Sequence, residues 1–389
     1  MPLPPIRPCV LMSTSLSPRP LPSRMPATRW FDGHLDLAML AELGRDLRAP
    51  LHAAHKPGEP AAVTFDSLAQ GRVTHCLATI FTEPDGPRDQ PTAYPATDPE
   101  AANAAGLRQL NRYQDWYRPH FYARLNNTPL PADSGPHAPD FLILIENADP
   151  ILDPEDLPDW REAGVVAIGL AWAKPSRYAG GNASDGGVTD LGRALIGHMD
   201  RLGIVHDASH LSDNAFWQLA DLSDQPIIAS HSNCRTLLGG GDRGENQRHL
   251  HDDQIRLIIQ RGGVIGLNLY STFLCPPHPH PAATRATIDH CITHIQHVCD
   301  IAGDRLHVGL GSDMDGGFSA SRLPVGIDSP ADLHRLADAL AALGWSDTDI
   351  HNFAWANWAR FWRIADAPPH HAHPVAPQAP APPTSPHLP

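Results

Sequence analysis

Eight short apolar runs, rich in β-branched residues, alternate along this chain with segments of helical periodicity. Such an alternation predicts βαβ units and a parallel sheet. Eight units within about 330 residues predict a (β/α)8 TIM barrel of the α/β class, with a doubly wound open sheet as the structural competitor. The eight runs are Trp30–Leu37, Val73–Phe81, Phe141–Asn147, Val165–Trp172, Ile204–His210, Pro226–Ser232, Gly263–Tyr270 and Leu306–Asp313.

The segments between these runs predict helices and one insertion. The amphipathic segments are Asp190–Leu202, Asp213–Leu222, Asp252–Gln260, Ala286–Ile301 and Ala331–Leu343. The connection around residues 82–140 exceeds a simple βα loop, so we interpret it as an insertion that contains a helix, Asp98–Leu125, and forms part of a pocket wall. We therefore expect one catalytic barrel domain over residues 29–366.

Composition limits the class of protein further. Residues 1–28 and the Pro- and His-rich residues 367–389 cannot supply a core, and we expect a disordered leader and tail. With 29 Lys and Arg against 43 Asp and Glu, the net charge of −14 argues against a nucleic-acid partner. No window reaches the ~18 apolar residues of a membrane span. The six cysteines form no Cys-x-x-Cys pair, which favours free thiols. We expect a cytoplasmic protein without a membrane anchor.

Polar residues stand where the predicted strands end. The set comprises His34, Asp36, Glu146, His210, His231 and Asp313. Because the carboxyl ends of barrel strands meet at one mouth, we expect these side chains to converge. His34 and Asp36 are two residues apart on a strand, so both should point to one face and chelate one ion. Asp32 shares that face in the pattern, and we interpret it as a deeper, supporting carboxylate.

Imidazole and carboxylate together suit zinc and related divalent ions. Three histidines and two carboxylates exceed the needs of one open tetrahedral site. They suit two ions that share a bridging carboxylate, and Glu146, which lies between the two ligand groups in chain order, is the expected bridge.

Several motifs of this chain resemble the membrane (renal) dipeptidase family of metallopeptidases, peptidase M19, in its bacterial soluble form. The motifs occur in the family's order, and the resemblance covers most of residues 30–363. They are "FDGHLDL", "DASHLSDNAFW", "PIIASHSNCR", "RHLHDDQIRLIIQRGGVIGLNLY" and "HVGLGSDMDG". The resemblance implies an amidohydrolase-type barrel with two zinc ions, which hydrolyses dipeptides through metal-bound hydroxide and often tolerates a D-residue at the C-terminal position. It also makes a homodimer reasonable.

Carried over motif by motif, the resemblance assigns roles to individual residues. His34 and Asp36 look like ligands of the first zinc, Glu146 the bridge, and His210 and His231 ligands of the second. Asp313 matches the residue that handles the proton of the attacking water and the leaving amine. Arg248 matches the arginine that holds the substrate's carboxylate, and a guanidinium fork suits that anion.

The chain also departs from the family pattern. His249 replaces a usual asparagine, "ENADP" replaces a Glu-Gly-Gly-His stretch, and Trp172 stands where many members carry a histidine. Trp172, Tyr178 and Tyr270 are expected to shape the substrate pocket, with ordinary packing as the alternative. These departures keep two other functions open, namely a binuclear-metal hydrolase of another amide, lactam or ester, and a non-catalytic metal-binding barrel. A carbamylated Lys174 as bridge is a further alternative to Glu146.

Overall fold

The computed structural model describes residues 28–56, 58–125, 139–239, 246–275 and 285–364. The predictions of a disordered leader and tail concern residues that, apart from Thr28, lie outside these ranges. Among the described residues, no helix is both long enough and apolar enough to cross a bilayer.

All eight predicted runs form strands of one sheet in which every neighbouring pair is parallel. The strands are β1 (Trp30–Leu35), β2 (Val73–Ile80), β5 (Asp140–Ile145), β6 (Val165–Gly169), β7 (Val205–Asp207), β8 (Ile227–Ile228), β9 (Ile265–Leu267) and β10 (Val308–Leu310). Their order is β8-β7-β6-β5-β2-β1-β10-β9, and a parallel bridge between Ala229 and Ile265 joins the two ends. The predicted barrel is confirmed, and the open sheet is wrong.

The strands end earlier than the apolar runs suggest. β7 ends at Asp207, β8 at Ile228 and β10 at Leu310. The predicted runs Ile204–His210, Pro226–Ser232 and Leu306–Asp313 extend beyond these ends into small and polar residues that lie outside the strands. His210, His231 and Asp313 therefore lie in the loops that follow the strands.

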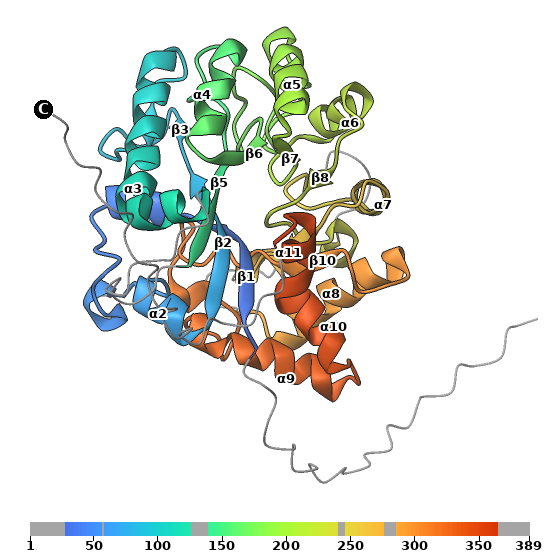
Figure 1. Cartoon of the computed structure of the whole chain (residues 1–389). Helices are drawn as coiled ribbons and strands as arrows, with labels where there is room; N and C mark the ends of the chain where they lie inside the picture. Colours follow the sequence, from blue (N-terminus) through green and yellow to red (C-terminus); the bar gives the residue numbers. More distant parts are fainter. Residues whose placement is uncertain (1–27, 57, 126–138, 240–245, 276–284, 365–389) are drawn as a thin grey trace, which may run out of the picture.

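The helices surround the barrel as Figure 1 shows. Three match their predicted bounds, namely α5 (Asp190–Leu202), α6 (Asp213–Leu222) and α7 (Asp252–Gln260). The others are α1 (Leu37–Glu42), α2 (Phe65–Gln70), α3 (Pro99–Leu125), α4 (Leu157–Glu162), α8 (Ile288–Ala302), α9 (His334–Ala342), α10 (Asp347–His351) and α11 (Asn357–Phe361). Short 3₁₀ turns are η1 (Leu51–Ala54), η2 (Pro154–Asp156), η3 (Arg235–Leu238), η4 (Ser271–Phe273), η6 (Ala320–Arg322) and η7 (Pro330–Leu333), and η8 (Asn352–Ala356) is a π-helical turn.

Helix α5 shows why the local sequence determined its bounds so well. The Thr189 side chain accepts a hydrogen bond from the Gly192 amide and caps the first turn. Gly203, with φ of 64°, ends the helix in the left-handed conformation that glycine adopts without strain. Leu195 and Met199, one turn apart, are buried on the face that packs against the barrel.

The segment predicted as an insertion contains α3 and two short parallel strands. β3 (Glu83–Pro84) pairs with β4 (Ala93–Tyr94), and both precede the long helix. Glu83, Pro87 and Gln90 line the cavity described below. The segment therefore contributes to a pocket wall, as we expected.

Apolar side chains fill the amino-terminal end of the barrel. Inward residues of the strands form a buried cluster with two tryptophans of the C-terminal helices: Phe31, Leu77, Leu144, Ala167, Ile228, Val264, Trp355 and Trp358. The Trp358 ring stacks on Phe31 with centroids 6.0 Å apart, and its indole N–H donates to the Leu310 carbonyl at 2.8 Å. The bottom of the barrel is thereby closed, which leaves the opposite end for polar side chains.

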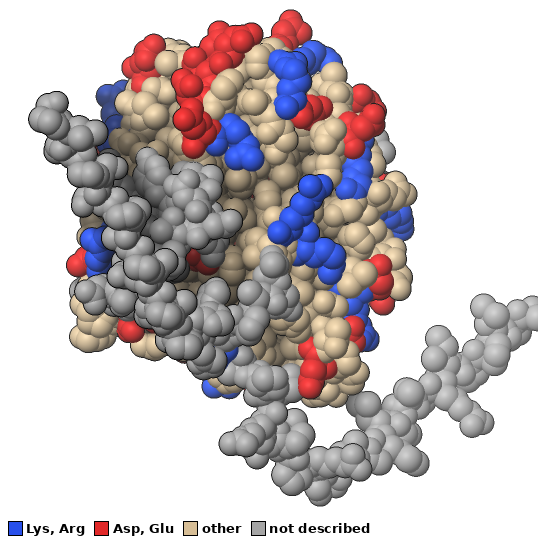
Figure 2. All heavy atoms as spheres, in the orientation of Figure 1, with Lys and Arg blue, Asp and Glu red and all other residues tan. Residues whose placement is uncertain are grey.

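Acidic and basic side chains are interspersed over the described part of the face drawn in Figure 2. Acidic side chains are most frequent along the top of this view. The five described cysteines are free thiols, namely Cys76, Cys234, Cys275, Cys291 and Cys299.

His294 on α8 predicts how acid affects stability. Its Nδ1 accepts from the Cys234 amide at 3.1 Å and its Nε2 donates to the Leu274 carbonyl at 3.2 Å, so the neutral ring fits both partners. Burial lowers the pKa of His294 to about 4. Since the unfolded chain binds this proton more tightly, the stabilisation present above pH 6.5 is lost as pH falls toward 4.

We expect this one residue to account for about 2 kcal/mol of unfolding free energy lost between pH 7 and pH 5. Urea unfolding of the wild type and of His294→Gln at both pH values measures this loss, and the substituted chain should show a pH dependence smaller by that amount. Equal pH dependence in the two proteins would contradict the assignment.

Candidate metal centre

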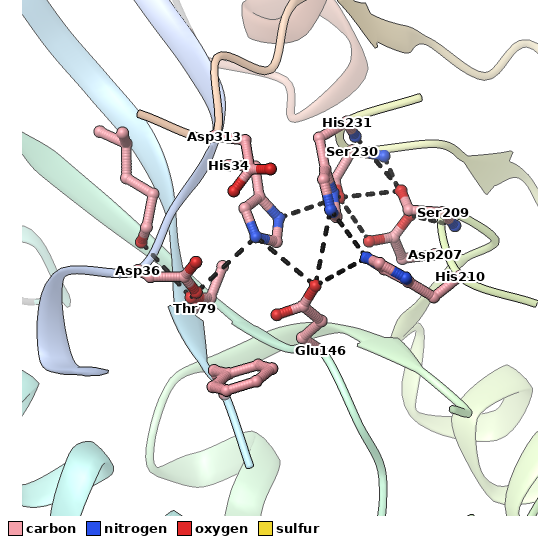
Figure 3. Close-up of polar contacts among 12 residues, drawn as sticks. His34, Asp36, Thr79, Glu146, Asp207, Ser209, His210, Ser230, His231 and Asp313 are labelled. Carbon is pink, nitrogen blue, oxygen red and sulfur yellow. Dashed lines mark hydrogen bonds and ion pairs between the residues drawn. The ribbon is translucent and has the colours of Figure 1, made fainter. Parts of the chain in front are cut away.

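The five residues predicted as metal ligands lie together at the carboxyl ends of the strands (Figure 3). His34 lies in β1, Asp36 directly after it, and Glu146 directly after β5. His210 and His231 lie in the loops after β7 and β8. All five side chains are buried. The predicted convergence is therefore present, although their role as ligands stays a prediction.

Strand β1 does not keep the simple alternation that the sequence suggested. Its register against β2 shifts, so that Asp32 faces Cys76 and Leu35 faces Ala78. Three steps along β1 thus correspond to two along β2. The Asp32 carboxylate accepts from the Ser312 amide at 2.7 Å and the His34 amide at 3.2 Å. It holds the backbone beneath the centre, which fits the supporting role expected of it.

Glu146 occupies the middle of the cluster. Its Oε1 atom lies 3.0 Å from His210 Nε2, 3.5 Å from His231 Nε2 and 3.7 Å from His34 Nε2. The His210 and His231 Nε2 atoms are 3.0 Å apart. Three imidazole nitrogens, one from β1 and two from the loops after β7 and β8, therefore face one carboxylate oxygen.

The donor atoms fit a divalent metal. His34 Nε2 is buried and has no hydrogen-bond partner within the described ranges, while the Asp36 and Glu146 carboxylates lie 3.7 Å from it. Such spacing is too long for a hydrogen bond but leaves room for a shared cation. The possible ligand atoms fall into two groups of three residues, and within each group they all lie within 4.8 Å of one another. One group is His34, Glu146 and His231, and the other is His34, Asp36 and Asp313.

The charges in the cluster depend on one another. Burial disfavours the charged form of His34, but the carboxylates of Glu146 and Asp36 outweigh it and raise its pKa to about 10. Burial also raises the pKa of Glu146 well above its ordinary value. For His210 and His231, burial and neighbouring positive charge lower the pKa well below 6.5, which keeps both rings neutral as metal ligation requires.

Asp313 joins the cluster from the loop after β10. Its carboxylate accepts from the Asn268 side-chain amide at 2.9 Å, and its backbone adopts a left-handed conformation with φ of 57°. Burial raises the pKa of Asp313 to about 7, against the opposing charge of His34.

A cavity of about 730 Å³ opens over the centre. Its walls include four of the five proposed ligands, namely Asp36, Glu146, His210 and His231, together with Arg248, Trp172, Tyr270, Phe81, Phe273 and Phe318. The Trp172 ring lies 5.2 Å from Phe81 and 5.9 Å from His210, centroid to centroid. Tyr270 stacks on Phe318 at 4.5 Å on another part of the wall. Both aromatic residues predicted to bind substrate therefore face the cavity.

Two sequence-based expectations are wrong. Tyr178 is buried in ordinary packing, with its hydroxyl donating to the Ile151 carbonyl at 2.5 Å, and it does not line the cavity. Lys174 donates to Glu83 at 3.2 Å and to the Pro84 carbonyl at 2.9 Å, so its amine is engaged away from the centre. It cannot replace Glu146 as a bridge in this arrangement.

Sequence reasoning missed the residues that hold the ligands. The Thr79 hydroxyl donates to Asp36, and the Asn182 side-chain oxygen faces His210 Nδ1 at 2.9 Å. Ser230 contacts two of the histidines. None of these residues stands at a distinctive spacing, so no periodicity could have identified them.

A parallel barrel that carries buried histidines and carboxylates at the carboxyl ends of its strands defines a class, the metal-dependent barrel hydrolases. Within that class, the chain belongs to the membrane dipeptidase family, peptidase family M19, whose family model matches residues 23–373. It is therefore a metal-dependent dipeptidase, a hydrolase of peptide bonds.

The chain is also similar to individual proteins. An uncharacterized dipeptidase of Schizosaccharomyces pombe is 27% identical over 358 residues, which cover 88% of this chain and 82% of the relative. An uncharacterized protein encoded in the pqqA 5' region of Klebsiella pneumoniae is 33% identical over 53% of this chain and 74% of its own. The crystal structure of a metallopeptidase from Rhodobacter sphaeroides has the same fold, with a TM-score of 0.71, 22% identity, and coverage of 87% of this chain and 99% of that chain.

Gly316 supplies a direct test of the cluster's geometry. A Cβ atom there would lie 1.8 Å from Asp313 Oδ1 and 2.9 Å from Asp36 Oδ2. We expect Gly316→Ala to displace both carboxylates and to lower kcat/KM on dipeptides by about 100-fold, as small misplacements of catalytic groups do. Gly197→Ala in α5 is the control, because a Cβ at Gly197 meets only the Arg201 guanidinium, at an ordinary contact distance of 3.6 Å. Equal activities of the two variants would contradict the geometry.

Proposed function

We propose that this protein is a zinc-dependent dipeptidase with a binuclear centre. His34 and Asp36 would hold one ion, His210 and His231 the other, and Glu146 would bridge them. The observation that carries the proposal is the position of Glu146 Oε1, within 3.7 Å of three imidazole nitrogens from β1 and from the loops after β7 and β8. Zinc bound there would polarise the peptide carbonyl and lower the pKa of the attacking water.

Asp313 is the proposed proton carrier. Its carboxylate lies beside His34 and Asp36 and lines the cavity, so it can reach both the attacking water and the departing nitrogen of a bound dipeptide. The Asn268 amide holds one carboxylate oxygen at 2.9 Å, which leaves the other free to accept and return the proton.

Arg248 is the proposed anchor for the substrate's free carboxylate. Its guanidinium donates to the carbonyls of Ser209 at 3.1 Å and His231 at 2.9 Å, which fix it beside the centre. Its Nε atom is buried without a partner among the described residues, so one donor remains to be satisfied. A carboxylate in the cavity would supply the missing acceptor and compensate the buried charge.

We further propose that the substrate is a short peptide with one free carboxylate. The Rhodobacter sphaeroides metallopeptidase is liganded with a phosphinate mimic of the dipeptide L-Ala-D-Ala. A cavity of about 730 Å³ accommodates a dipeptide, and the apolar surfaces of Trp172 and Tyr270 favour uncharged side chains.

A hydrolase of another amide, lactam or ester is the second candidate. The observation that favours it is Trp172, whose indole stands beside His210 where many family members carry a histidine. A non-catalytic barrel is disfavoured, because it would not account for the buried Asp313 carboxylate, which serves as proton carrier in the proposed mechanism. A homodimer, cytoplasmic localisation and the lack of a nucleic-acid partner stay predictions from the sequence.

The proposal predicts that the purified protein contains two zinc ions per chain and hydrolyses a panel of L,L- and L,D-dipeptides. Chelation should abolish turnover, because the carbonyl and the water lose their activating cation, and added zinc should restore it. Elemental analysis and a ninhydrin assay measure the two properties. Turnover that survives complete removal of metal would refute the mechanism.

A second prediction concerns Arg248→Lys. The ammonium lacks the planar fork, so we expect KM for a dipeptide to rise about 10- to 100-fold, the value of one or two charge-assisted hydrogen bonds. The matched control is the corresponding dipeptide amide, which has no carboxylate and should be hydrolysed equally poorly by both proteins. If the ratio of kcat/KM for the dipeptide to kcat/KM for its amide is the same in both proteins, Arg248 does not bind the carboxylate. That result would favour the second candidate function.

A further inference from the structure

Ser230, the residue before His231, has its backbone deep inside the barrel. Added Cβ atoms on Gly266 and on Gly311 would each lie 1.9 Å from the Ser230 carbonyl oxygen, and one on Gly33 would lie 2.7 Å from it. Three glycines of β1, β9 and the end of β10 thus leave the space that this residue occupies. Its hydroxyl group lies between His34 and His231 on one side and Asp207 on the other (Figure 3).

The Ser230 hydroxyl proton is committed to Asp207. The hydroxyl donates to Asp207 Oδ2 at 2.6 Å. Asp207 Oδ1 accepts from the Ser230 amide at 2.9 Å, and from the Ser209 amide and hydroxyl at 3.1 and 2.7 Å. An ionised carboxylate can only accept, and this one is 2% exposed, so each oxygen needs its donor.

Two histidines of the centre contact the same hydroxyl oxygen. His231 Nδ1 lies 2.8 Å from Ser230 Oγ, and His34 Nδ1 lies 3.2 Å from it. Because the hydroxyl proton already points to Asp207, both ring nitrogens must donate their own proton to the two lone pairs of the oxygen. An imidazole that carries its proton on Nδ1 presents an unprotonated Nε2, which is the form that binds a metal.

We propose that Asp207 and Ser230 are positioning residues that fix the tautomer and the ring orientation of one imidazole in each of the two zinc sites. The inference rests on the proposed binuclear function, in which His34 serves the first ion and His231 the second. A single hydroxyl then couples the two sites. The third imidazole is held independently, since His210 Nδ1 faces Asn182 Oδ1 at 2.9 Å.

The substitution Asp207→Asn tests this arrangement without changing its shape. The two backbone amides at Oδ1 can only donate, so the asparagine oxygen must remain there and its NH₂ group must face Ser230 Oγ. The serine oxygen then accepts from the asparagine, and its own proton turns to a histidine Nδ1 or to Ser209 Oγ, which lies 3.0 Å away. In either case the Nδ1–H group of at least one of the two histidines loses its acceptor, so the tautomer with an unprotonated Nε2 is no longer held there.

The experiment measures zinc affinity of the full chain by competition with a chromophoric chelator, and the visible absorption of the cobalt-loaded protein. We expect Asp207→Asn and Ser230→Ala each to weaken binding about 10- to 100-fold, as loss of such hydrogen bonds does at other metal sites, and to alter the cobalt spectrum. Ser223→Ala is the matched control. It removes a buried serine that donates to Asp200 at 2.9 Å and lies 3.4 Å from His206, away from the cavity. It should bind zinc like the wild type.

Thermal unfolding of each variant checks that the fold is retained. If Asp207→Asn does not fold, Ser230→Ala decides, because it leaves both Nδ1–H groups without an acceptor and must still weaken binding. If the wild type binds zinc and the folded variants bind it equally tightly, the positioning role of Asp207 and Ser230 is overturned, while the proposed function stands. A wild-type chain that binds neither zinc nor cobalt would overturn the proposed function and, with it, this inference.

Discussion

The rest of this structure depends on the burial of several ionisable side chains at one point. Glu146, Asp36 and Asp313 are nearly inaccessible, and His34 and His231 lie between them. Removing one such charge from water costs several kcal/mol unless an opposite charge compensates it. Imidazoles and carboxylates compensate one another here only in part, as the shifted pKa values of His34 and Glu146 indicate. A pair of divalent cations would complete the compensation.

The barrel makes this concentration of charge tolerable by separating an apolar end from a polar one. Trp355 and Trp358 close the amino-terminal end, where inward residues such as Phe31 and Leu144 exclude water. Leu144 lies near the end of β5, and Glu146 follows two residues later, at the polar end of the barrel. The strands and the loops directly after them thus bring the proposed ligands together, and residues of these loops also line the cavity.

Much of the architecture could be predicted from local pattern. The bounds of α5, α6 and α7 follow from caps and helical periodicity, and the convergence of the proposed ligands could be expected because the strand ends of a parallel barrel meet at one mouth. The register shift in β1 and the early ends of β7 and β8 could not be predicted, since they depend on hydrogen bonds between strands distant in sequence. Tyr178 was misplaced for the same reason, because its partner Ile151 is known only from the fold.

The sequence by itself determined the eight barrel strands, several of the helices between them and the residue types available for a metal, because these depend on periodicity and side-chain chemistry. Tertiary structure alone decided which polar residue contacts which. Asp207, Ser230 and His34 come from β7, the loop after β8 and β1, and they share one chain of hydrogen bonds only after the barrel has closed. Hydrogen bonds act over about 3 Å, and no pattern along the chain records which groups folding will bring within that distance.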